Sequence, residues 1–68
     1  MGWVVVYVAP NRAVAEMLKR RLESEGLRVA IRRLGDSVTG GKRGLCQVMV
    51  PSSEAREASE LLLRSLRA

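Results

Sequence analysis

The hydrophobic and polar positions of this chain follow two periods, which divide its first half into a strand and a helix. Residues 3–9, WVVVYVA, are almost all β-branched or aromatic, which is typical of a strand. The apolar positions that follow recur at the spacing of a helix: Val14, Met17, Leu18 and Leu22. Asn11 is a suitable N-cap and Gly26 a suitable left-handed C-cap, so we expect the helix to lie between them.

The second half returns to period two before a second helix. Residues 27–32 alternate apolar and mostly polar side chains, which predicts a half-buried strand. Residues 45–50, LCQVMV, predict a third strand that ends at Pro51. Ser52 or Ser53 then caps a helix with glutamates in its first turn and arginines in its last, as the helix dipole favours.

The predicted order is therefore β-α-β-β-α, in a single domain over residues 1–68. Two helices can cover one face of a three-stranded antiparallel sheet, which predicts an α+β, two-layer sandwich. Strand alternation assigns one set of side chains to the helix-covered face: Val4, Val6, Val8, Leu27, Val29, Ile31, Cys46, Val48 and Val50.

The opposite, uncovered face is predicted to carry more apolar side chains than a solvated sheet face normally does. Large exposed apolar patches usually mark an interaction surface, so we expect a homodimer or another homo-oligomer. The candidate interaction face consists of Trp3, Val5, Tyr7, Arg28, Arg32, Leu45 and Met49. The alternative is a misjudged register, because a shift of one residue inverts a whole strand and would place some of these residues in the core.

The net charge of +5 is concentrated in the middle of the chain. In residues 27–44, five cationic residues accompany one aspartate, which leaves +4 in that segment. A basic surface attracts nucleic acid, anions or acidic proteins. The alternative function is therefore weak binding of nucleic acid or an anionic ligand through the hairpin 27–44, with Lys42, Arg43 and Arg33 as candidate anion-binding residues.

Residues 34–44, LGDSVTGGKRG, superficially resemble a phosphate-binding loop. A P-loop needs a glycine five positions before its Gly-Lys pair, a serine or threonine after it, and a following helix. Here Asp36 stands in place of that glycine, Arg43 stands in place of the serine or threonine, and a predicted strand follows instead of a helix. We therefore interpret the segment as a hairpin connection, with a looser nest of backbone amides as the alternative.

The composition offers little for catalysis. The chain has no histidine and a single cysteine, so it lacks a histidine-based triad, an imidazole metal site and an internal disulfide. Cys46 beside Lys42 and Arg43 could be an activated thiol, but strand alternation places it on the covered face, where a small apolar cysteine is common. We expect a non-enzymatic protein without a cofactor or metal.

Location follows from similar observations. The longest apolar run falls far short of the ~20 residues that cross a bilayer, and the N-terminus has no signal-peptide pattern. A single cysteine suits a reducing compartment. The expectation is a cytoplasmic protein that does not bind a membrane.

Two segments, 4–27 (VVVYVAPNRAVAEMLKRRLESEGL) and 48–62 (VMVPSSEAREASELL), each run from a strand into a proline and then a helix. In this the chain resembles a family of small bacterial β-α-β-β-α proteins of unknown function that are described as signal-transducing. The resemblance implies half of a ferredoxin-like fold, with the first strand beside the third. Some relatives carry a glutamate decarboxylase label, which this sequence contradicts because neither Lys19 nor Lys42 lies in an enclosed position that could hold pyridoxal phosphate.

Overall fold

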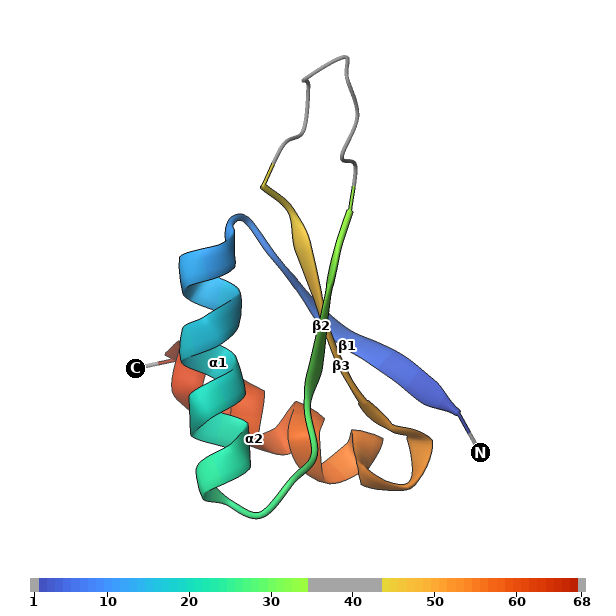
Figure 1. Cartoon of the computed structure of the whole chain (residues 1–68). Coiled ribbons are helices and arrows are strands. Elements are labelled where there is room, and N and C mark those ends of the chain that lie inside the picture. Colours follow the sequence, from blue (N-terminus) through green and yellow to red (C-terminus); the bar gives the residue numbers. More distant parts are fainter. Residues whose placement is uncertain (1, 35–43, 68) are drawn as a thin grey trace.

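The computed structural model describes residues 2–34 and 44–67, and it confirms the predicted order of elements (Figure 1). The elements are β1 (Trp3–Ala9), α1 (Arg12–Ser24), β2 (Ala30–Arg33), β3 (Cys46–Pro51), the short 3₁₀ helix η1 (Ser52–Glu54) and α2 (Ala55–Arg67). The connection between β2 and β3, where the sequence predicts a hairpin turn, falls on residues 35–43 and lies outside the described residues.

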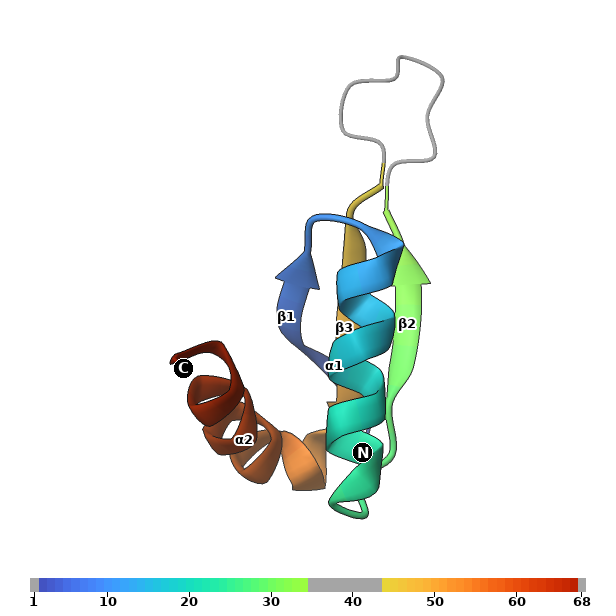
Figure 2. The ribbon, with the colours of Figure 1, turned by 90° about the vertical axis from the view of Figure 1, so that its left-hand side faces the viewer.

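The three strands form one antiparallel sheet in the order β1-β3-β2. The first strand therefore lies beside the third, as the family resemblance implies. Both helices lie on the same side of the sheet, and α1 crosses in front of it (Figure 2). The molecule is thus the predicted two-layer α+β sandwich, with the other sheet face uncovered among the described residues.

The core lies between the sheet and the helices. Alternate residues of β3 are buried, as predicted, because they face the helices while their neighbours face outward. The buried residues are Ala9, Ala15, Leu18, Leu22, Leu27, Cys46, Val48, Val50, Ala58 and Leu62. Full burial of a side chain the size of Leu22 or Val48 contributes about 1.5–3 kcal/mol, so these few residues carry much of the fold's stability.

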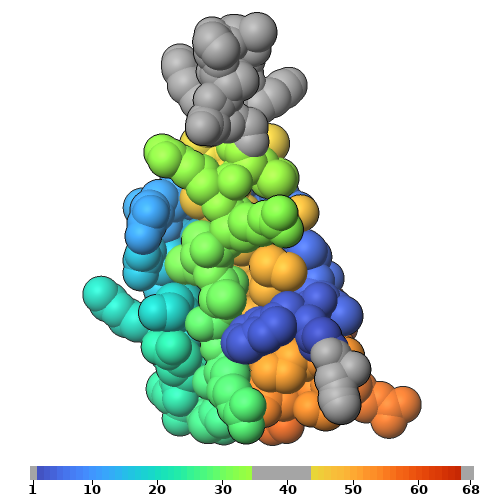
Figure 3. Space-filling view, turned by 45° about the vertical axis from the view of Figure 1, so that its right-hand side comes forward, coloured from blue at the N-terminus to red at the C-terminus, as the bar shows by residue number. Residues whose placement is uncertain are grey.

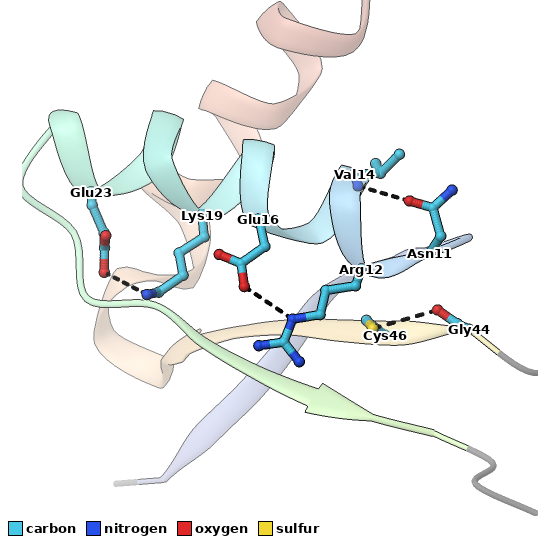
Figure 4. Close-up of polar contacts among 8 residues, drawn as sticks. All are labelled: Asn11, Arg12, Val14, Glu16, Lys19, Glu23, Gly44 and Cys46. Carbon is cyan, nitrogen blue, oxygen red and sulfur yellow. Dashed lines mark hydrogen bonds and ion pairs between the residues drawn. The ribbon is translucent and has the colours of Figure 1, made fainter.

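Helix α1 begins and ends as its sequence predicts. The Asn11 side-chain oxygen accepts a hydrogen bond of 2.9 Å from the Val14 amide (Figure 4). At the other end Gly26 has φ +90°, and its amide donates to the carbonyl of Glu23. The next amide, of Leu27, donates to the carbonyl of Leu22, which completes a Schellman motif.

The second strand is shorter than its alternation predicts, because β2 begins at Ala30 rather than at residue 27. In the β2–β3 register, Arg28 would stand opposite Pro51, which has no amide hydrogen to donate. The Arg28 amide instead donates to the Glu54 carboxylate over 2.9 Å. The ladder therefore ends where the partner strand can no longer pair.

The start of the second helical segment also differs from the prediction. Ser52 and Ser53 lie inside η1, and the N-terminus of this turn has no side-chain cap hydrogen bond. The Ser52 amide donates to the carbonyl of Gly2 instead, which ties the turn to the start of β1. The chain thus enters α2 through a 3₁₀ turn held by the sheet rather than through a serine cap.

Strand β1 differs most from the prediction, because it contains a β-bulge. Val5 stands opposite Met49 of β3, but the next residue of β3, Val48, stands opposite Tyr7. Val6 is therefore the extra residue of the bulged strand. A bulge of this kind inverts the facing of every residue beyond it, since one residue is inserted into a pattern of period two.

Two predicted placements are consequently wrong. Tyr7 lies on the helix-covered face, where it packs against the core, and not on the uncovered face with Trp3. Val8 lies on the uncovered face opposite Gln47 and is 44% exposed, although alternation assigns it to the core. Ala9, which regular alternation would turn outward, is fully buried.

Candidate interaction surface

The uncovered sheet face carries an apolar area along one end, built from cross-strand neighbours. Val5 and Met49 stand opposite each other, and Met49 also stands opposite Ala30 of β2. Trp3, two residues before Val5 on the same face of the strand, stands opposite Pro51. We call these five residues the open-face patch. Figure 3 shows this side of the molecule, with β2 in green, β3 in yellow to orange and β1 in dark blue.

The patch is exposed mainly along β1. The Trp3 side chain is 48% exposed and that of Val5 is 41% exposed, whereas Met49 and Ala30 are half-buried. A tryptophan and a valine left this open on an edge strand give up much of the free energy that burial would supply, about 25 cal/mol per Å² of apolar surface. The exposed row on β1 is therefore the part of the face best suited to burial by a partner.

The other end of the face is polar. The next cross-strand row consists of Val8, Gln47 and Arg32, and the Arg32 side chain is exposed. Leu45, which the sequence assigns to the interaction face, lies just before β3 and is half-buried. The face thus changes from apolar to polar along the strands, so an apolar surface of a partner would bind over its apolar end.

Arg28 lies outside β2, at the apolar end of the face. Together with Gly2, Trp3, Pro51, Ser52 and Ser53 it lines a hollow of about 370 Å³. The Arg28 Nε lies 4.0 Å from a carboxylate oxygen of Glu54, and its side chain is 73% exposed. An ion pair this exposed contributes little, about 0–1 kcal/mol, but Glu54 partly offsets the positive charge here.

Of the three candidate anion-binding residues, Arg33 is the one that falls within the described residues. Arg33 stands opposite Cys46, on the helix side of the sheet, while Arg32 stands opposite Gln47 on the uncovered face. These two exposed cations therefore point to opposite sides. Lys42 and Arg43 lie outside the described residues, so the predicted site stays a prediction.

A second apolar surface lies on the helix side, and the sequence interpretation missed it. A groove of about 300 Å³ separates β1 from α2 and is lined by Val6, Tyr7, Ser59, Leu62, Leu63 and Leu66. Leu63 is 64% exposed, and Leu66 is 49% exposed. The available signal was the run of three leucines at 61–63, because three consecutive residues of a helix cannot all face one narrow core.

Cys46 is the candidate nucleophile that the sequence offers. Cys46 is buried, and its Sγ lies 3.4 Å from the carbonyl oxygen of Gly44 (Figure 4). The thiol therefore lies on the helix-covered face, where alternation places it. Over residues 2–34 and 44–67, His, Cys, Asp and Glu side chains form no group of three that could hold a metal.

Neither helix is long and apolar enough to cross a membrane, within the part of the chain that the structure describes. In comparisons with known proteins, no family model, no curated protein and no solved structure matches this chain. The resemblance to the small signal-transducing family therefore stays a prediction from the sequence.

Proposed function

We propose that this protein is a small non-enzymatic regulatory or adaptor domain of the cytoplasm that acts by self-association through its uncovered sheet face. The observation that carries the proposal is the open-face patch, in which Trp3 and Val5 of an edge strand are both more than 40% exposed. A patch of this kind on a small domain is stabilised when a second apolar surface covers it.

A second copy of the chain is the partner that this surface suits best. The patch contains no charged residue, so two copies can meet there without burying a like-charge pair. The net charge of +5 comes from residues outside the patch, so an acidic partner would be attracted to those residues rather than to the patch. Arg32, at the polar end of the face, and Arg28, which is paired with Glu54 at the apolar end, both border the patch rather than belong to it.

Weak binding of nucleic acid or an anion remains the second candidate, supported by the exposure of Arg32 and by Trp3 on the same open face. Exposed aromatic side chains beside cations can stack single-stranded bases. Among the described cations, however, Arg33 faces the other side of the sheet and Arg28 is paired with Glu54. The self-association proposal therefore has the stronger structural support.

Fluorescence of the single tryptophan tests the proposal directly, because Trp3 lies inside the patch. Raising the protein concentration from micromolar to millimolar should shift the Trp3 emission maximum to the blue as the indole leaves water. Val5→Lys should abolish the shift, because it places a charge in the interface. Ala13→Lys is the matched control, since it adds the same charge at an exposed position of α1, on the other side of the sheet.

Far-UV circular dichroism should show both variants folded. An emission maximum that stays red and independent of concentration in the wild type would refute the proposal. A shift instead produced by adding single-stranded RNA to a monomeric protein at low salt would support the second candidate.

A further inference from the structure

The free edge of β1 is defined by the hydrogen-bond pattern at its start. The Ser52 amide donates to the Gly2 carbonyl over 2.9 Å, so these two residues form a hydrogen-bonded pair of the antiparallel ladder. Such pairs alternate with pairs whose backbone groups point away from each other. The backbone amide and carbonyl of Val4 therefore point to β3. Those of Trp3 and Val5 point away from β3, towards the open edge.

The same alternation applies beyond the bulge. The Leu34 amide donates to the Leu45 carbonyl over 2.9 Å, which makes Arg32 and Gln47 the next hydrogen-bonded pair between β2 and β3. The backbone of Gln47 is thus turned to β2, and Val8, which stands opposite it on β1, has backbone groups that point to the open edge. No strand among residues 2–34 and 44–67 pairs with this edge.

Proteins usually protect such an edge with charge, proline or a covering segment. The seven residues of β1 contain no charged side chain and no proline. Its one protective feature is the bulge at Val6. An uncharged apolar edge strand is a template for another strand.

Apolar side chains flank this edge on both faces of the sheet. Trp3 and Val5 lie on the uncovered face, and the groove between β1 and α2 exposes Leu63 and Leu66 on the helix side. A strand added at the edge would therefore find apolar surface above and below it. That arrangement distinguishes a site for strand addition from an edge that is merely exposed.

We propose that β1 of a second copy pairs antiparallel with β1, so that two three-stranded sheets join into one six-stranded sheet. This inference rests on the proposed self-association and places the contact at the β1 border of the uncovered face, where the partner strand would lie beside Trp3 and Val5. A stable interface needs about 800 Å² per partner, roughly one sixth of this chain's 4697 Å². One edge strand supplies only part of that area, and the exposed leucines of α2 supply the rest by packing against the partner's β1 and α2.

The second copy is favoured over a foreign strand by the composition of β1 itself. An antiparallel pair of identical strands about a two-fold axis is self-complementary when neither strand carries charge. Residues 3–9 meet that condition. The β1 edge also lies on the opposite side of the sheet from β2, so pairing there does not bring together Arg32 and Arg33 of the two copies.

Amide hydrogen exchange, measured by NMR on the full chain at concentrations below and above the dimer dissociation constant, tests the inference. The amides of Val5 and Val8 should exchange at least about tenfold more slowly in the dimer, because they gain hydrogen bonds. Ile31 and Arg33 are internal controls: their amides point to the free edge of β2, so their exchange should not depend on concentration. Leu63→Lys should raise the dimer dissociation constant at least tenfold, and Ala13→Lys should leave it nearly unchanged.

The outcomes separate this inference from the proposed function. A dimer that Val5→Lys disrupts, but in which the Val5 and Val8 amides stay unprotected and Leu63→Lys has no effect, associates by face stacking and overturns edge pairing alone. A chain that stays monomeric at millimolar concentration overturns both proposals. Protection that appears only after another protein's extended peptide is added would show that the edge takes a foreign strand, and would overturn the assignment to a second copy.

Discussion

Two glycines illustrate how individual residues set the backbone. Gly26 and Gly44 both have positive φ, +90° and +97°, which residues with a Cβ adopt at a cost of about 1–2 kcal/mol. They differ in their surroundings. A Cβ at Gly26 would meet open space, whereas a Cβ at Gly44 would lie 3.3 Å from the carbonyl oxygen of Pro10.

We therefore expect Gly44→Ala to lower the free energy of unfolding more than Gly26→Ala does. Gly26→Ala should cost only the conformational term, about 1–2 kcal/mol, and serves as the control. Urea denaturation followed by far-UV circular dichroism measures both. Equal costs would mean that the Pro10–Gly44 contact places no restriction on this part of the fold.

Prediction at the residue scale succeeded where the cause is local. Asn11 and Gly26 were identifiable because a cap depends on the few residues beside it, and both act as predicted. Helical spacing places Leu66 on one apolar stripe with Ala55, Ala58 and Leu62, yet Leu66 is about half exposed. Its exposure depends on how α2 packs against β1, and the spacing of residues within one helix does not determine that packing.

At the scale of elements, β1 offers the sharpest test, because the bulge exchanges the environments of two neighbouring residues. Tyr7→Ser should destabilise the fold by roughly 1–2 kcal/mol, since Tyr7 packs against the core. Val8→Ser, the matched control with the same product, should cost clearly less, because Val8 is 44% exposed. Thermal unfolding of both variants at low concentration measures this, and the reverse order would indicate a strand without a bulge.

The sequence predicted all three strands and both helices, but not the bulge or the true start of β2. WVVVYVA is apolar on both faces, so no polar residue marks where the period of two is interrupted. The start of β2 depends on Pro51, which lies about twenty residues away in another strand. Both features come from pairing between strands. Of the two aromatic residues predicted on the uncovered face, Tyr7 was therefore misplaced because it follows the bulge, whereas Trp3 precedes the bulge and was placed correctly.

At the scale of the whole molecule, β1 joins the two apolar surfaces. The open-face patch lies on one side of the strand and the leucine groove on the other, with the unpaired backbone edge between them. Figure 2 shows how this arises: α1 covers the middle of the sheet, and α2 lies lower and further towards β1. One additional strand would bury parts of all three surfaces.

The net charge predicts how association depends on salt. Two copies that each carry +5 repel each other, and added salt screens that repulsion while leaving burial of apolar surface intact. Self-association should therefore strengthen when NaCl rises from about 0.05 to 0.5 M. Binding of nucleic acid would weaken over the same range, because it depends on released counterions.

Self-association can be measured by sedimentation equilibrium of the unmodified chain at these two salt concentrations, from micromolar to millimolar protein. We expect a reversible dimer of the 7.5 kDa chain, with a dissociation constant that falls as salt is added. A single 7.5 kDa species at every concentration and both salt levels would contradict it.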